Sequence, residues 1–296
     1  MPRPLRPALI HGTYHITAHG VNEEDVFRAD SDRRFYMFLL KKHAARGGVR
    51  VLAYVLMSNH VHLVVSTADT NLSSLIQRVH GIYGAWFNRQ YGRRGHLFGS
   101  RFYSDAVSTD AHLLASTRYV HRNPVRAHMV ERPEEYAWSS YRAYVGVEPD
   151  GLVDPLPVLQ CFATERSAAA TAYESFVLER TDLAGLLQSI NSGQRSTRDL
   201  VMAAADLLNL VPTAVDHRTR GSPARRLTCM LLQRVLGWTP HRIASEMGME
   251  YAGVVSALKE DNHRGERHEN ERARFKEILA LLDGAPQAVG SKTGHV

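Results

Sequence analysis

Hydrophobic and polar residues follow two different periods in the first half of the chain. A period of two, with many β-branched and aromatic residues, indicates strands, and it occurs over residues 13–20, 49–57, 60–65 and 101–108. Apolar positions three and four apart indicate helices, and they occur over residues 31–48, 71–92 and 109–123. The pattern therefore predicts four strands and three helices before Pro124, which should end or kink the third helix.

The order of these elements is β-α-β-β-α-β-α, which predicts an α+β fold of ferredoxin-like type. The second and third strands are separated only by the Ser58-Asn59 turn, so we expect them to form a hairpin. In this architecture the strands make a small antiparallel sheet with helices on one face. The residues available to cap the three helices are Ser31, Asn71, and either Thr109 or Asp110.

The second half of the chain has a helical pattern throughout. Residues 156–180 predict one or two short helices, and a polar break follows at residues 191–196. Further helices are predicted over residues 197–210, 222–237, 239–249, 251–262 and 271–283. We therefore divide the chain into a first domain over 1–150, a helical connector over 151–195, an all-α domain over 196–283 and a disordered tail over 284–296.

Composition excludes several classes of protein. No apolar run is long enough for a membrane-spanning helix, and the N-terminal residues have no apolar segment of the kind that secretory signals carry. The two cysteines cannot form a disulfide framework or a four-cysteine zinc site. We therefore expect a cytoplasmic protein with no membrane partner.

The positive charges suggest a polyanionic partner. The formal net charge is +6, and the stretch RQYGRRGHLFGSR carries four arginines and no acidic residue. Arginines interleaved with aromatic residues can follow phosphates while the rings stack on unpaired bases, although a solvated basic loop has the same composition. The four arginines are Arg89, Arg93, Arg94 and Arg101.

The stretch MSNHVHLVV places two histidines in a predicted strand. Because residues two apart in a strand point to the same face, His60 and His62 would lie side by side with Val61 on the opposite face. Two neighbouring imidazoles can bind one divalent cation, but they can also be ordinary histidines of a half-exposed strand. With 16 histidines in the chain, one such pair is expected by chance, so the pair alone does not decide between these readings.

Several motifs in a fixed order resemble the HUH single-strand-DNA transposases, in particular the REP-associated tyrosine transposases. They are YHITAHGVNEEDVF, AYVLMSNHVHLVV, YGRRGHLFGSRFYS, RYVHRNPVRAHMV and EYAWSSYRAYVG, and they span about residues 10–146. The resemblance implies that His60 and His62 bind a divalent metal, Mg²⁺ or Mn²⁺, that Tyr119 is the nucleophile, and that Asn123 is a third ligand. Tyr119 and Asn123 are four residues apart, so they share one helix face.

The implied reaction is metal-dependent cleavage and transfer of single-stranded or hairpin DNA through a 5′-phosphotyrosine intermediate. A single tyrosine nucleophile distinguishes this pattern from the replication relaxases with two tyrosines. The same resemblance is compatible with a DNA-binding regulator of palindromic repeats that no longer cuts. Whether the tyrosine acts at the metal site of its own chain or of a partner stays open, as does the choice between monomer and homodimer.

The helical second half is similar to the helix-turn-helix DNA-binding domain of the bacterial replication initiator. The similarity lies in the paired Arg225 and Arg226, in HRIASEMGM, which includes Arg242, and in YAGVVSALK as the recognition helix. The initiator's Asp-His-Ser/Thr signature is replaced here by YAGVV, so a different target is expected. A helical bundle that packs or dimerises is the alternative. With the four loop arginines, the candidate DNA contacts are completed by Arg122, Arg126, Arg225, Arg226 and Arg242.

Overall fold

The computed structural model describes residues 11–68, 72–99, 101–147, 151–179, 182–208, 223–259, 273, 275, 277 and 278. The chain forms two compact units, Met1–Glu179 and Arg180–Val296. Among the described residues, no helix combines the length and apolar character needed to cross a membrane. The predicted tail over 284–296 and most of the predicted helix over 271–283 lie outside these ranges.

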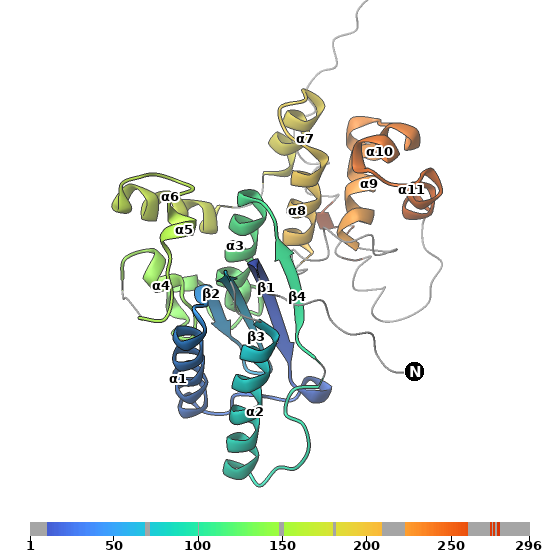
Figure 1. The fold of residues 1–296 in the computed structure, drawn as a ribbon. Helices are drawn as coiled ribbons and strands as arrows, with labels where there is room; N and C mark the ends of the chain where they lie inside the picture. The colour runs from blue at the N-terminus through green and yellow to red at the C-terminus, as the bar shows by residue number, and fades with distance from the viewer. Residues whose placement is uncertain are drawn as a thin grey trace, which may run out of the picture. The chain divides into compact units, whose positions relative to one another are not determined.

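A four-stranded antiparallel sheet forms the centre of the first unit (Figure 1). Its strands are β1 (Gly12–His19), β2 (Arg50–Leu56), β3 (His60–Thr67) and β4 (Tyr103–Val107). They lie in the order β2-β3-β1-β4, so the two central strands are β3 and β1. Helices α1 (Asp30–Gly47), α2 (Leu72–Gln90) and α3 (Asp110–Arg126) alternate with the strands in the β-α-β-β-α-β-α order that the hydrophobic pattern predicts.

The two faces of the sheet pack against different helices. Val61, Leu63 and Val65 of β3 belong to one core with buried residues of α1 and α2. The alternate residues of β3 face α3, since the ring of His62 contacts Tyr119 of that helix. The expectation that all helices lie on one face was therefore wrong for α3. Both faces of the central strands are buried, which lets polar side chains on the α3 side be enclosed.

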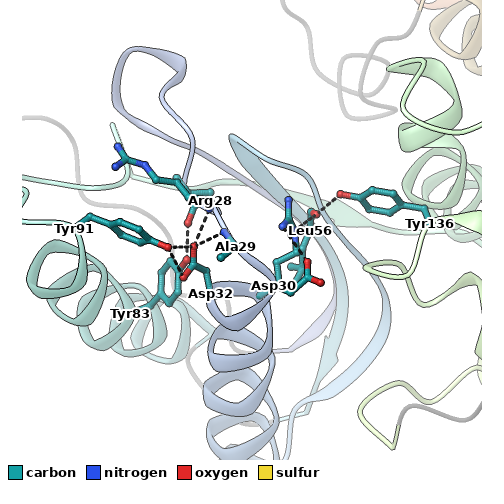
Figure 2. Close-up of polar contacts among 10 residues, drawn as sticks. Arg28, Ala29, Asp30, Asp32, Leu56, Tyr83, Tyr91 and Tyr136 are labelled. Carbon is teal, nitrogen blue, oxygen red and sulfur yellow. Dashed lines mark hydrogen bonds and ion pairs between the residues drawn. The ribbon is translucent and has the colours of Figure 1, made fainter.

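The start of α1 is fixed by an aspartate rather than by the predicted cap Ser31. The buried Asp32 carboxylate accepts hydrogen bonds from the backbone N–H groups of Arg28 and Ala29, and from the Tyr91 hydroxyl (Figure 2). A carboxylate at the first turn satisfies amide groups that the helix itself cannot pair. Asn71, the predicted cap of α2, lies outside the described residues.

Helix α3 begins as predicted and ends later than predicted. The Thr109 side chain accepts a hydrogen bond from the backbone N–H of His112, which makes it the cap. Pro124 lies within the last turn, and the helix continues to Arg126. A proline near the end removes only one amide hydrogen bond from the last turn, so the helix is not stopped before Asn123.

The rest of the first unit packs on the outer side of α3. It consists of the 3₁₀ turn Pro133–Glu135 and the helices α4 (Tyr141–Tyr144), α5 (Leu156–Leu159) and α6 (Arg166–Leu178). These three helices share a hydrophobic cluster with residues of α3. A further 3₁₀ turn, Val21–Glu23, lies elsewhere, between β1 and α1, where the Val21 N–H donates to the Leu97 carbonyl. Residues 151–179, which we expected in the connector, therefore belong to the first unit, and the division falls after Glu179.

The second unit is helical over its described residues. Its helices are α7 (Leu183–Asn191), α8 (Thr197–Leu207), α9 (Pro223–Leu236), α10 (Pro240–Met247) and α11 (Tyr251–Leu258). They share one hydrophobic core. Gly248 ends α10 in the left-handed conformation, with φ of 58°, so the chain turns sharply before α11.

Candidate active site

Four histidines and a threonine lie together on the face of the sheet that packs against α3. The antiparallel register pairs His60 with His19, and His62 with Thr17. The ring centroids of His60 and His62 are 4.9 Å apart, and the ring of His19 stacks on His60 at the same distance. The spacing of two in the sequence therefore places both predicted ligands side by side, as expected.

Both predicted ligand histidines are neutral at pH 7. Burial lowers the pKa of His60 to about 4, helped by His19 and opposed by a hydrogen bond between His60 and Asn123. Burial, followed by the neighbouring histidines, lowers the pKa of His62 well below its usual value. A neutral imidazole keeps a lone pair on one nitrogen, which is the form that binds metals.

The Nδ1 atom of each ring has a neighbour. In His62 it lies 3.0 Å from Thr17 Oγ1 and 3.3 Å from His15 Nε2. In His60 it lies 2.6 Å from Asn59 Oδ1. These contacts fix the rings in place and leave the Nε2 atoms as the candidate ligand atoms.

Tyr119 lies beside the histidine pair, as the motif predicts. Its ring is edge-on to His62, with centroids 5.2 Å apart, and edge-on to His15 at 5.8 Å. The side chain is only 6% exposed. The guanidinium carbon of Arg126 lies 5.1 Å from the centroid of the Tyr119 ring, so a positive charge adjoins the phenol.

Asn123 completes the arrangement. It lies one helical turn after Tyr119 and hydrogen-bonds to the His60 side chain. A residue before a proline is usually not helical. Asn123 nevertheless keeps helical geometry, because α3 is continuous through Pro124. The four residues singled out from the sequence thus meet at one place, from β3 and α3.

The donor set suits a divalent cation. Among the described residues, no three or more histidine, cysteine, aspartate or glutamate side chains are grouped so as to hold a metal. The available set is instead two neutral imidazoles and the Asn123 amide, whose oxygen is a hard donor that Mg²⁺ and Mn²⁺ accept. Three ligands would leave coordination positions open for a phosphate.

A second buried polar layer adjoins the site and was missed in the sequence. The Asp105 carboxylate of β4 lies 3.5 Å from His112 Nε2 of α3, and both side chains are buried. Burial, helped by His112, lowers the pKa of His15 to about 3. His15, Thr17 and His19 alternate along β1 as the two predicted ligands alternate along β3, which is the signal that was available.

His121 points away from the site. Its Nδ1 lies 2.6 Å from the Tyr173 hydroxyl of α6, and its Nε2 lies 2.8 Å from Ser140 Oγ. Ser140 in turn hydrogen-bonds to the backbone of Tyr54 in β2. His121 therefore connects α3 to its outer neighbours.

The predicted DNA-contacting arginines of the first unit fall into different surroundings. Arg93 forms an ion pair with Glu24, with Nη2 and Oε2 2.7 Å apart, and donates to the His96 carbonyl, so it holds the loop together. The side chains of Arg89, Arg94 and Arg101 are exposed. Arg122 is half-buried on α3, as is Arg126 beside Tyr119.

The predicted contacts of the second unit all lie on described helices. Arg225 and Arg226 are half-buried on α9, and the guanidinium carbon of Arg226 lies 5.7 Å from the Phe275 ring centroid. Arg242 of α10 is exposed, and its guanidinium carbon lies 3.8 Å from the Trp238 ring centroid. Arg242 therefore presents a pre-oriented charge at the surface.

Comparisons with known proteins found similar solved structures and one matching family model. A structure of a REP-associated tyrosine transposase bound to a REP hairpin is 16% identical, with a TM-score of 0.42 over 52% of this chain and 90% of that chain. A putative transposase from Deinococcus radiodurans is 15% identical, with a TM-score of 0.29 over 43% of this chain and 95% of that chain. No curated protein matched. The family model described as "Transposase IS200 like" matches residues 9–123, a range that contains His60, His62, Tyr119 and Asn123. The matched region, which is less than half of the chain, is thus similar to the IS200-like transposases.

Proposed function

We propose that the first unit is a metal-dependent endonuclease and strand transferase for single-stranded DNA, with Tyr119 as its nucleophile. The observation that carries this proposal is the edge-on contact between the Tyr119 ring and His62, at 5.2 Å between centroids. It joins a nucleophile-bearing helix to a strand that carries two neutral imidazoles. The sheet order β2-β3-β1-β4 supports a ferredoxin-like architecture for this unit.

His60, His62 and Asn123 would hold the metal, Mg²⁺ or Mn²⁺. When bound, the cation would polarise a non-bridging phosphate oxygen and stabilise negative charge on the leaving 3′-oxygen. The side chains contribute lone pairs without adding negative charge, since imidazole and amide are neutral. The site therefore keeps its attraction for the phosphate of the substrate.

The protein's own groups account for the remaining steps. The Tyr119 oxygen, after losing its proton to solvent, attacks the phosphorus and forms a Tyr–O–P bond. The P–O3′ bond breaks, and the 3′-oxygen takes up a proton to become a free hydroxyl. Attack by a second DNA 3′-hydroxyl reverses the exchange, so strand transfer needs no external energy source. The Arg126 guanidinium lies beside the ring, where it would attract the phosphate.

The geometry favours a tyrosine that acts at the metal site of its own chain. Tyr119, His62 and Asn123 all come from one chain, and the ring of Tyr119 already contacts that of His62. A monomer would then be sufficient for cleavage.

Hairpin or repeated palindromic DNA is the proposed substrate. The exposed arginines Arg89, Arg94 and Arg101 could follow phosphates next to the site. In the second unit, the sharp turn at Gly248 between α10 and α11 supports a helix-turn-helix that would bind duplex DNA in the major groove. Arg225, Arg226 and Arg242 would contact that duplex.

The test uses labelled single-stranded oligonucleotides that carry palindromes, incubated with Mn²⁺ or Mg²⁺ and resolved on a denaturing gel. We expect a covalent protein–DNA band that requires metal and disappears in Tyr119→Phe and in His60→Ala. Binding of the same oligonucleotide should be retained in Tyr119→Phe. Tight binding without any covalent band in the unaltered protein would instead identify a regulator of palindromic repeats that does not cut.

A further inference from the structure

We propose that Asn59 is a positioning residue that holds His60 in the tautomer with its proton on Nδ1 and its lone pair on Nε2. The inference concerns the neutral imidazole alone, and its use in metal binding rests on the function proposed above. Asn59 lies in the turn between β2 and β3, directly before His60.

The backbone of this turn is held on several sides. The carbonyl of Asn59 accepts a hydrogen bond from the backbone N–H of Gly20, with N and O 2.8 Å apart. The carbonyl of the preceding Ser58 accepts from the N–H groups of Val26 and Phe27, at 2.8 Å and 3.0 Å. The turn is thus anchored to the loop over residues 20–27, and the Asn59 side chain starts from a fixed place.

Hydrogen bonding determines which end of the Asn59 amide faces His60. The Nδ2 atom lies 3.4 Å from the Glu23 carbonyl oxygen, which can only accept a hydrogen bond. The NH₂ group must therefore face Glu23, which leaves Oδ1 at 2.6 Å from His60 Nδ1. Because Oδ1 is also only an acceptor, Nδ1 must be the donor and must carry the proton.

The second nitrogen of His60 then has the lone pair. A neutral imidazole carries a single N–H, so protonation at Nδ1 leaves Nε2 able to accept a hydrogen bond or bind a metal. Asn123 contacts the same side chain from α3. In the neighbouring His62, Nδ1 is likewise beside an oxygen, Thr17 Oγ1, so in both rings Nε2 is the nitrogen that this partner does not occupy.

The loop that supplies the Glu23 carbonyl is shaped for this contact. Asn22 and Glu23 both have positive φ, 50° and 62°, which turns the chain tightly back toward the sheet. A Cβ atom at Gly20 would lie 2.0 Å from the Glu24 carbonyl oxygen, so only glycine fits at the start of the loop. The chain of contacts therefore runs from a constrained loop through Asn59 to His60.

Nuclear magnetic resonance of the metal-free full chain, labelled with ¹⁵N at histidine, tests the tautomer directly at pH 8. In the proposed tautomer the unprotonated nitrogen is Nε2, which couples to both ring C–H protons, and the His60 signals are assigned by their absence in His60→Ala. We expect the unaltered protein to show this pattern. Asn59→Ala should lose it in favour of a mixture with the Nε2–H form, and Asn59→Asp, which keeps an acceptor, should retain it.

A matched control separates loss of the acceptor from general disturbance. Asn88 also donates its amide to a backbone carbonyl, that of Gly95, but lies on α2 away from the histidines. Asn88→Ala should leave the His60 pattern unchanged. The proposal is overturned if His60 in the unaltered protein carries its proton on Nε2, or if Asn59→Ala leaves the tautomer as it was.

A second measurement links the tautomer to metal binding without using activity. Titration of Mn²⁺ by electron paramagnetic resonance should show affinity weakened by about 10- to 100-fold in Asn59→Ala, with Asn59→Asp near or above the unaltered protein. If the unaltered protein shows the expected tautomer but no Mn²⁺ binding that His60→Ala removes, the metal-dependent function fails while the role of Asn59 in orienting His60 stands.

Discussion

The ring of Tyr119 meets the ring of His62 edge-on within a single chain, with centroids 5.2 Å apart. The contact predicts the outcome of a mixing experiment. A mixture of Tyr119→Phe and His60→Ala proteins contains intact tyrosines and intact histidine pairs, but never in the same chain. If the tyrosine acts at its own chain's site, as proposed, the mixture should form no more covalent product with single-stranded DNA than either variant alone, at least about a thousand-fold below the unaltered protein.

Two further mixtures make this result interpretable. Unaltered protein mixed with either variant should keep its own activity, which would show that neither variant inhibits it. Recovery of covalent product in the double-variant mixture, increasing with protein concentration, would mean that the tyrosine is exchanged between partners.

The hydroxyl of Thr17 is predicted to support metal binding through His62. Replacing it in Thr17→Val removes the oxygen 3.0 Å from Nδ1 while keeping nearly the same volume. The Mn²⁺ dissociation constant should rise about 10-fold or more, because an unsupported imidazole loses its fixed orientation. Thr17→Ser, which restores a hydroxyl, should bind nearly as the unaltered protein does.

Thr13 offers the matched control on the same strand. It has the same side chain and the same parity along β1, but pairs with Ser66 and Val107 rather than with the histidines. Thr13→Val should leave Mn²⁺ affinity unchanged. An equal loss in Thr13→Val and Thr17→Val would indicate a general effect of valine on β1 rather than a specific hydrogen bond.

Much of the first unit was predictable from local sequence signals. The period-two pattern located the strands, and the spacing of His60 and His62 placed their side chains on one face without further information. The family motif, rather than the residue pattern, selected Tyr119 from 12 tyrosines. Its contact with His62 agrees with that selection.

What could not be predicted depends on contacts between distant segments. Periodicity shows that a helix has an apolar face, but not which face of the sheet it covers, so the position of α3 was missed. The contact between Asp32 and the Tyr91 hydroxyl was not expected either, because Tyr91 lies just after α2, far from Asp32 in the sequence. The role of His15 likewise requires the β1–β3 register, which a single strand does not reveal.

His121 is predicted to matter for stability. His121→Leu leaves the Tyr173 hydroxyl without the partner at 2.6 Å in a buried cluster, so the free energy of unfolding should fall by about 1–3 kcal/mol. Urea unfolding measures the change. In a Tyr173→Phe background the same substitution should lower the free energy of unfolding clearly less, because that background has no Tyr173 hydroxyl to be left without a partner. An equal cost in both backgrounds would exclude that hydrogen bond as the source.

The buried His80 should make stability fall in mild acid. Burial lowers its pKa to about 3, and its Nε2 lies 3.0 Å from the Tyr36 hydroxyl. The unfolded chain binds a proton near pH 6.5 while the folded protein does not, so this contribution is complete above about pH 6.5 and is lost as the pH falls toward 3.

The effect of His80 can be isolated by comparison with His80→Gln, which keeps a polar group near Tyr36 and does not titrate. Between pH 7 and pH 5 the unaltered protein should lose about 2 kcal/mol more of its free energy of unfolding than the variant. The other buried histidines contribute equally to both proteins and cancel. Parallel stability curves over this pH range would mean that His80 is protonated in the folded protein.

Removal of the second unit should separate cleavage from targeting. The truncated chain ending at Glu179 keeps the whole sheet, α3 and the helices α4–α6 that pack on it, so its chemistry on a short single-stranded oligonucleotide should stay within a few-fold of the full chain. Affinity for duplex DNA next to the hairpin should fall, since Arg225, Arg226 and Arg242 are lost. In the full chain, Arg242→Ala should weaken duplex binding and reduce its salt dependence without changing oligonucleotide cleavage, because one phosphate-neutralising charge is removed. Loss of cleavage in the truncated chain, with its fold intact by circular dichroism, would show that the second unit takes part in the chemistry itself.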